Sequence, residues 1–256
     1  IAFRHNSQSL LGEGLRLTGA HTDSPSLKVK PNPEVYRQGY VQLGVEVYGG
    51  ALFAPWFDRD LSIAGRVHYK SRRGELRSAL IDFSDPIAVI PSLAIHLNRG
   101  VNDSRSINAQ KELVPLLSQL GKEEDFDFNE LLLQQVKKQP AHRSAQEILA
   151  HELFLYDTQA ASLIGLKQEF ISSARLDNLL SCFLACKALV NCKNTHASLL
   201  VCNDHEEVGS VSSSGAQGPF LKSVLERLVH CCGDETDLLS RIVAKSSLIS
   251  IDNAHG

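Results

Sequence analysis

Histidine and carboxylate side chains recur in this sequence at the points where apolar segments end. His21 and Asp23 follow one apolar segment, and Glu206 and Glu207 follow another, residues 197–202. Parallel strands in α/β enzymes bring such side chains together at their carboxyl ends, where these enzymes place their chemistry. Imidazole and carboxylate groups without thiolates are typical ligands of zinc in an open, hydrolytic site.

Two further aspartates follow the same pattern. Asp177 precedes an expected helix over 178–190, and Asp252 follows an expected strand over 247–251. Carboxylates that lie close together at the carboxyl-terminal edge of a buried sheet repel one another unless a cation lies among them. A carboxylate shared by two metal ions holds them about 3.5–4 Å apart, so both can act on one water and one carbonyl. Asp177, at the start of its helix, is the expected bridging residue.

The spacing within two clusters suggests separate roles for their members. Neighbouring side chains diverge on an extended backbone, so one residue of the pair Glu206 and Glu207 can bind metal while the other serves as a general base. His21 and Asp23 are two residues apart, which places them on the same side of a strand end. Asp23 can then accept the second imidazole N–H and orient His21.

The segments that must position these clusters predict an interrupted α/β domain. Strands are expected over 15–20 and 197–202, and a second helix over 219–229. Between them, the glycine-punctuated alternation that begins near residue 31 is typical of antiparallel strands, and a helix is expected over 113–138. The predicted organisation is a catalytic α/β domain over 1–30 and 166–256, interrupted by a β-rich insertion over 31–165.

The composition narrows the classes of function. The 256 residues are 43% hydrophobic and 21% charged, as in a globular protein, and the net charge of −3 comes from interleaved acidic and basic residues. We therefore expect no nucleic-acid partner. No apolar run reaches the ~20 residues of a membrane span. The six cysteines form no CxxC pair, which favours reduced thiols and a cytoplasmic location.

Six ordered motifs resemble those of the aspartyl aminopeptidase family of dinuclear zinc aminopeptidases. They are GAHTDSP (19–25), WFDRDL (56–61), PSLAIHL (91–97), ARLDNL (174–179), DHEEVGS (204–210) and SIDNAHG (250–256). The resemblance covers nearly the whole chain. It implies a zinc-exopeptidase-like, three-layer catalytic domain with an inserted β-rich dimerisation domain.

The resemblance also implies an activity and a set of site residues. The activity is release of N-terminal Asp or Glu from short peptides through a water activated by two Zn²⁺, for which Co²⁺ or Mn²⁺ can substitute. The implied metal ligands are His21, bridging Asp177, Glu207 and Asp252. Glu206 is the implied general base, Asp23 orients His21, and His96 matches a histidine that reaches the active site of the neighbouring subunit.

Members of this family form dimers that build a dodecamer, so self-association is expected. They also continue beyond the motif at 250–256, into a segment with the last histidine ligand and the residues that recognise the acidic side chain. The sequence is therefore expected to be truncated at its C-terminus, and also at its N-terminus, where it begins within a strand-like segment.

Each site residue also has an ordinary structural explanation. Asp177 could cap its helix, Asp252 could be a turn residue, and the glutamate pair could be solvated. His96 could be a hydrogen-bonded structural histidine in an apolar run. Each explanation is reasonable for its own residue, but together they explain poorly why all these residues occur in one sequence.

Three other functions remain open from the sequence alone. A dizinc aminopeptidase with a different residue preference would keep the same centre, and a scaffold protein of the same fold would keep the metal without turnover. A serine hydrolase is disfavoured because the sequence has no G-x-S-x-G motif.

Overall fold

The computed structural model describes residues 1–4, 6–121, 125–193 and 195–254. The chain divides into two compact units: Ile1–Ser24 with Leu163–Gly256 form the first, and Pro25–Ser162 form the second. The second unit therefore begins and ends a few residues earlier than the insertion over 31–165 that the sequence predicts. Strand β3 (Ser26–Arg37) explains the earlier limit, because it pairs with β4 (Tyr40–Tyr48) of the second unit from its first residue.

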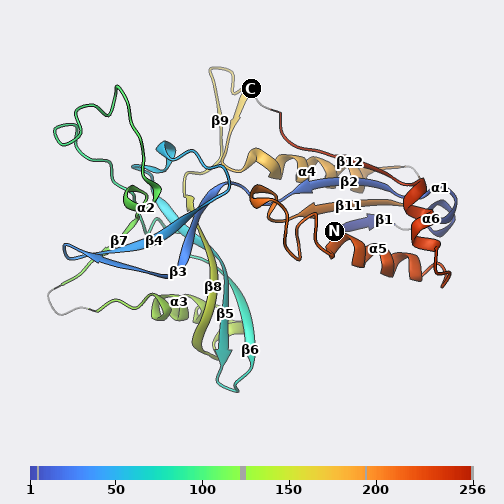
Figure 1. Ribbon diagram of the computed structural model, residues 1–256, viewed down its shortest axis with the longest axis horizontal. Coiled ribbons are helices and arrows are strands. Elements are labelled where there is room, and N and C mark those ends of the chain that lie inside the picture. The colour runs from blue at the N-terminus through green and yellow to red at the C-terminus, as the bar shows by residue number, and fades with distance from the viewer. Residues whose placement is uncertain (5, 122–124, 194, 255–256) are drawn as a thin grey trace. The chain divides into compact units, whose positions relative to one another are not determined.

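A mixed sheet forms the centre of the first unit (Figure 1). Its strands lie in the order β1 (Ala2–Arg4), β11 (Ser198–Asn203), β2 (Arg16–His21) and β12 (Ser247–Ser250). The strands β11, β2 and β12 are parallel, whereas β1 is antiparallel to β11. Because His21 pairs with Asn203, the carboxyl ends of β2 and β11 reach the same edge of the sheet.

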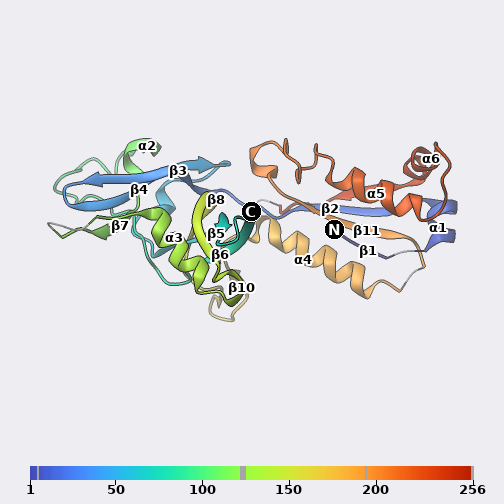
Figure 2. The same cartoon turned by 90° about the horizontal axis from the view of Figure 1, so that it is seen from below.

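Helices cover both faces of this sheet (Figure 2). The helix α4 (Leu176–Asn191) lies on one face. The helices α5 (Phe220–His230) and α6 (Leu238–Lys245) lie on the other, where α1 (Ser7–Glu13) packs against α6. Leucine, valine and isoleucine side chains of β2, β11, α1, α5 and α6 form one buried core. The α/β fold with three layers that the sequence predicts is confirmed.

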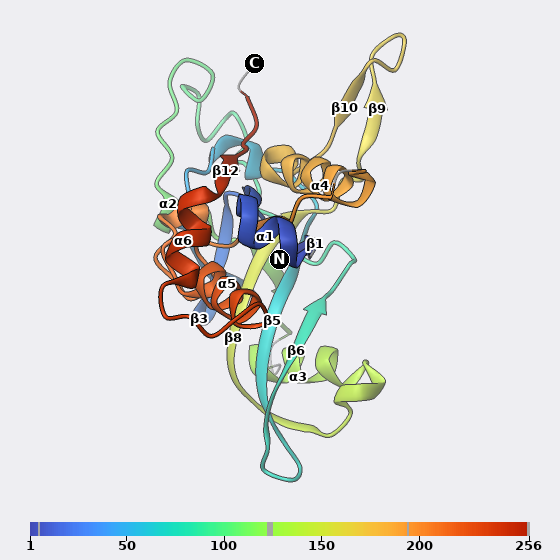
Figure 3. The ribbon, with the colours of Figure 1, turned by 90° about the vertical axis from the view of Figure 1, so that its right-hand side faces the viewer.

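The second unit is an antiparallel sheet with a helix packed against it. The strand order is β6 (Leu76–Asp82), β5 (Leu61–Ser71), β8 (Ala145–Asp157), β3, β4 and β7 (Leu116–Gln119). The helix α3 (Phe128–Lys137) lies beside β8 and β6 (Figure 3) and buries Leu132 and Val136 in the core of this unit. A short helix, α2 (Ala109–Glu112), also belongs to this unit. The hairpin of β9 (Ser162–Ile164) and β10 (Phe170–Ser172) starts at the last residue of this unit, and its other residues belong to the first unit.

The structure corrects the predicted elements in two places. The helix expected over 113–138 is the strand β7 followed by α3, and residues 122–124 lie outside the described part. The helix α3 begins late because Asp127 caps it by accepting a hydrogen bond from the backbone N–H of Glu130. The sequence does not predict α6, since its eight residues give only two turns of periodic pattern.

Two observations bear on the surroundings of the protein. The six cysteines, all of them in the described part of the chain, form no disulfide bond. Within the described ranges, no helix combines the length and the apolar character that crossing a bilayer requires.

Candidate metal centre

The carboxyl edge of the first unit's sheet carries most of the predicted site residues. His21 ends β2 and is buried, with 5% of its surface exposed. Glu206 and Glu207 open the short 3-10 helix η3 (Glu206–Val208), which follows β11. Asp252 follows β12, and Asp177 lies at the start of α4. The elements around this edge therefore deliver all five side chains to one place.

The imidazole of His21 is surrounded by carboxylates from three other parts of the chain. Its Nε2 atom lies 3.6 Å from Oδ1 of Asp177, 3.6 Å from Oδ1 of Asp252 and 3.9 Å from Oε2 of Glu206. The ligand atoms form two groups, each within 4.8 Å: His21 with Glu206 and Glu207, and His21 with Asp177 and Asp252. The side chains of Asp177, Glu206 and Asp252 are half-exposed, so the cluster is open on one side.

Asp23 makes contacts that its spacing from His21 does not predict. The Nδ1 atom of His21 lies 3.0 Å from the backbone carbonyl oxygen of Asp23 and 3.5 Å from its carboxylate. The carboxylate itself accepts hydrogen bonds from the backbone N–H groups of Glu206 and Glu207, both at 3.1 Å. Asp23 therefore holds the turn with the two glutamates as well as contacting the histidine.

The start of α4 is tied to the neighbouring strands by side-chain hydrogen bonds. The Oγ of Ser24 donates to the carbonyl oxygen of Asp177 at 2.7 Å, and Nδ2 of the fully buried Asn178 donates to that of Ile251 at 2.9 Å. The peptide bond between Asp177 and Asn178 is cis, and neither residue has helical dihedral angles. The N-cap position is Arg175, without a side-chain cap. The regular part of α4 therefore begins after Asn178, and the suggestion that Asp177 caps it stays a prediction.

The electrostatics of the cluster favour a bound cation. Burial raises the pKa of Glu207, the nearby His21 opposes that shift, and the carboxylates of Glu206, Asp23 and Asp177 raise it further. Negative charges held this close are stabilised by a cation placed among them.

The donor atoms suit zinc, because nitrogen and oxygen ligands with an open side are the pattern of hydrolytic zinc sites. In both donor groups found among the described residues, no cysteine takes part. The thiol of Cys182 donates to the carbonyl oxygen of His21 at 3.1 Å, and burial together with Cys202 raises its pKa to about 12. A thiol held protonated in this way is a poor metal ligand.

Comparison with known families agrees with this chemistry. The model of the family described as aminopeptidase I zinc metalloprotease (M18) matches residues 1–256. The chain belongs to the M18 family. The fold of its first unit is accordingly zinc-peptidase-like.

Named relatives point to the same family. The chain is 55% identical over 256 residues to a probable M18 family aminopeptidase 2 of Ectopseudomonas mendocina and 56% identical to that of Pseudomonas aeruginosa strain LESB58. Each match covers 100% of this chain and 58% of the relative, so the chain spans little more than half the length of these proteins.

Solved structures share the fold over almost all of this chain. Chaetomium thermophilum mApe1 matches with a TM-score of 0.84 and 30% identity, over 99% of this chain and 61% of that one. The mApe1 dodecamer of S. cerevisiae matches with a TM-score of 0.75 and 29% identity, over 95% of this chain and 55% of that one. Aminopeptidases of this family therefore contain both units.

The predicted site residue His96 lies outside this cluster, and two other histidines, His205 and His255, stand beside proposed ligands in the sequence. His96 belongs to the second unit, where it is exposed in a turn at residues 95–97. His205, beside the glutamate pair, contacts Oγ of Ser212 through Nδ1 at 2.8 Å. That hydroxyl also accepts a hydrogen bond from the backbone N–H of Gly215, which is the geometry of a loop-forming serine. His255 lies outside the described residues.

Proposed function

We propose that the full-length protein is a metal-dependent aminopeptidase that releases N-terminal aspartate or glutamate from short peptides. The observation that carries this proposal is the buried imidazole of His21, with carboxylate oxygens of Asp177, Asp252 and Glu206 within 4 Å. Membership of a zinc aminopeptidase family supports the reaction class. The preference for acidic residues rests on the resemblance of the six sequence motifs to aspartyl aminopeptidases.

The two donor groups support a centre for two zinc ions. His21, Asp177 and Asp252, which form one of the donor groups, would hold one ion. Glu207 would hold the second ion together with the bridging Asp177, as the resemblance of the motifs implies. Co²⁺ and Mn²⁺ would also fit this centre, because oxygen and nitrogen ligands accept several divalent metals. Zinc in such a site lowers the pKa of water and polarises a carbonyl group.

Glu206 is the proposed general base. Its carboxylate is half-exposed at the open side of the cluster, and its backbone N–H is held by Asp23. In this position it can take a proton from the attacking water and pass it to the leaving amine. Asp23 would orient His21 and fix the direction of Glu206 at the same time.

The substitution Glu206→Gln tests this role in the full-length protein. We expect turnover to fall by roughly 10²–10⁴-fold, because a neutral amide cannot take the proton. Zinc content should stay that of the wild type, whereas Glu207→Gln, which removes a proposed ligand, should lower it. Activity retained by Glu206→Gln would contradict the assignment of the base.

The second unit is proposed to mediate dimerisation and to place His96 in the active site of a neighbouring subunit. Dimers would then build a dodecamer, which a structural neighbour at 29% identity forms. A cytoplasmic location is part of this proposal and is supported by the six cysteines, all in the described part of the chain, which form no disulfide bond.

A panel of aminoacyl anilides separates the alternative functions. Metal-dependent release of neutral residues in preference to acidic ones would favour a dizinc aminopeptidase of other specificity. Zinc binding without release of any residue would favour the scaffold protein.

A further inference from the structure

The pair Phe57 and Asp58 contacts both ends of the loop that carries His96. At the beginning of the loop, the backbone N–H of Ser92 donates to Oδ1 of Asp58 at 2.8 Å. Two residues before Ser92 in the sequence, the carbonyl oxygen of Ile90 accepts a hydrogen bond from the backbone N–H of Asp58 at 2.9 Å. At the far end, the guanidinium of Arg105 lies 4.0 Å from the centre of the Phe57 ring. All three contacts lie within the second unit.

The anchored ends differ from the stretch between them. Ile90 and Phe57 are buried in the core of the second unit. Residues 93–97, in contrast, are exposed, and their hydrogen bonds are local turns, from Leu97 N–H to Ala94 and from Asn98 N–H to Ile95. The direction of His96 therefore depends on where the ends of the loop are fixed.

Asp58 is suited to this contact by its backbone and by its charge. Its φ of 57° is left-handed, a conformation that Asp and Asn adopt more readily than most residues. The hydrogen bond from Ser92 is the largest cause of the lowered pKa of its carboxyl group, and Arg105 also lowers it. An ionised carboxylate is the stronger acceptor for a backbone N–H.

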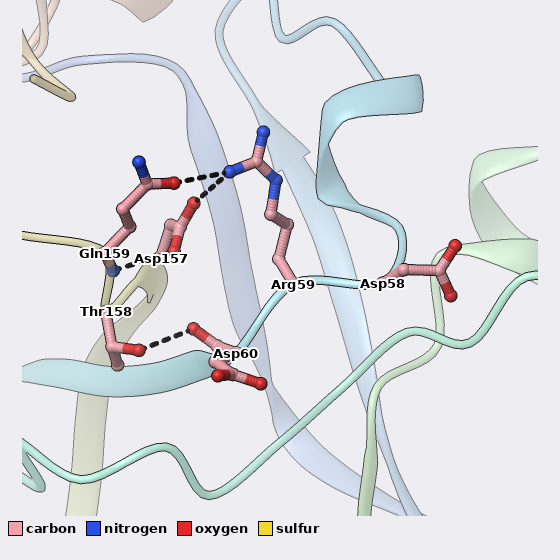
Figure 4. Close-up of a pocket in the computed structure, with 6 residues that line it drawn as sticks. All are labelled: Asp58, Arg59, Asp60, Asp157, Thr158 and Gln159. Atoms are coloured by element: carbon pink, nitrogen blue, oxygen red, sulfur yellow. Dashed lines mark hydrogen bonds and ion pairs between the residues drawn. The ribbon is translucent and has the colours of Figure 1, made fainter. Parts of the chain in front are cut away.

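The neighbouring residues of the same motif have other partners (Figure 4). Arg59 pairs with Asp157 at 3.0 Å and with Gln159 at 2.9 Å. The carbonyl oxygen of Asp60 accepts from the hydroxyl of Thr158 at 3.0 Å. The side chain of Asp58 points away from this group, so its contact with Ser92 is separate from the ion pair beside it.

We propose that Asp58 is a positioning residue for His96: its carboxylate fixes the start of the loop and thereby sets where the histidine lies for the reaction. The proposal rests on the catalytic role of His96 in the proposed function. It assigns to the motif at 56–61 a function in the reaction that its sequence alone does not indicate.

A double-mutant cycle in the full-length protein tests this coupling. The variants are Asp58→Ala, His96→Ala and the pair combined, with Asp58→Asn as the conservative replacement. Loss of a hydrogen bond to a charged group should lower kcat of Asp58→Ala about tenfold. Asn keeps both the acceptor and the left-handed preference, so Asp58→Asn should recover most of the rate. In the His96→Ala background, Asp58→Ala should cause no further loss.

The controls separate this inference from the proposed function. Asp85→Ala changes another exposed aspartate of the second unit, one whose backbone N–H bonds to Phe83, and should leave kcat unchanged. His96→Ala alone reports whether the histidine acts in catalysis. If Asp58→Ala costs the same factor with and without His96, or costs nothing, the positioning role is wrong. An unaltered thermal unfolding temperature and oligomeric state of Asp58→Ala would exclude a general folding defect.

Discussion

Asp23 connects residues of the centre that lie far apart in the sequence. Its backbone carbonyl contacts Nδ1 of His21, and its carboxylate accepts from the N–H groups of Glu206 and Glu207, 183 and 184 residues away. The side chain of Asp23 is 8% exposed. One aspartate thereby fixes the histidine relative to both glutamates.

Replacing Asp23 should loosen the centre without removing a proposed ligand. We expect Asp23→Ala to lower zinc affinity by about 10–100-fold, the usual effect of losing a residue that orients ligands. Asp23→Asn keeps one acceptor oxygen and should fall between Ala and the wild type. Competition with a chromophoric zinc chelator measures the affinity. An affinity of Asp23→Ala equal to that of the wild type would show that the turn needs no such support.

Glu207 predicts how the stability of the metal-free protein depends on pH. Its pKa in the folded chain lies above its ordinary value of 4.5, chiefly because of burial. Protonated Glu207 therefore stabilises the folded state below pH 4.5, and this contribution is lost as the pH rises through the raised pKa. As the pH rises from 4.5 through the raised pKa, the free energy of unfolding of the wild type should fall relative to that of Glu207→Gln, whose amide stays neutral.

Urea denaturation of the two proteins in the presence of chelator, at a series of pH values, measures this difference. Added zinc should stabilise the wild type more than the variant at neutral pH, since the metal binds only to ligands arranged by folding. A difference between the two proteins that is independent of pH would contradict the account of Glu207.

Among the strands, β5 and β8 depend on a close approach at Gly65. Gly65 pairs with Leu153 and has a φ of 151°. A Cβ atom at this position would lie 2.1 Å from the carbonyl oxygen of Glu152, which belongs to the backbone of β8. The strand therefore requires glycine here.

The substitution Gly65→Ala should destabilise the second unit. We expect the free energy of unfolding to fall by roughly 2–4 kcal/mol, the sum of a strained backbone and overpacking. Gly12→Ala is the matched control, because a Cβ there meets nothing within 4 Å and Gly12 lies inside α1. That change should add up to ~1 kcal/mol of stability. Equal urea midpoints for Gly65→Ala and the wild type would contradict the close approach.

Periodic segments of the chain were predictable, whereas contacts between distant residues were not. The buried run of β11 and the strand β2 follow from local apolar patterns, with limits shifted by about one residue. The hydrogen bond from Asn178 to Ile251 and those to Asp23 join residues far apart, so no local pattern encodes them. The six motifs predicted which side chains gather around His21, but not which of these contacts hold them there.

Taken together, the two units match one family along the entire chain. The family model spans residues 1–256, and the structural neighbours with TM-scores of 0.84 and 0.75 include both units. The chain covers 58% of its bacterial relatives. Activity is therefore to be measured on the full-length protein.

Hydrolysis of aspartyl and glutamyl α-anilides, compared with that of leucyl and alanyl anilides, tests whether the protein is a metal-dependent aminopeptidase for acidic residues. The measurement is made on the full-length protein as purified, after treatment with a chelator, and after zinc is restored. We expect release of the acidic residues in preference to the neutral ones, loss of this activity with the chelator and its return with zinc. Release that persists after complete removal of metal would contradict the proposed centre at His21.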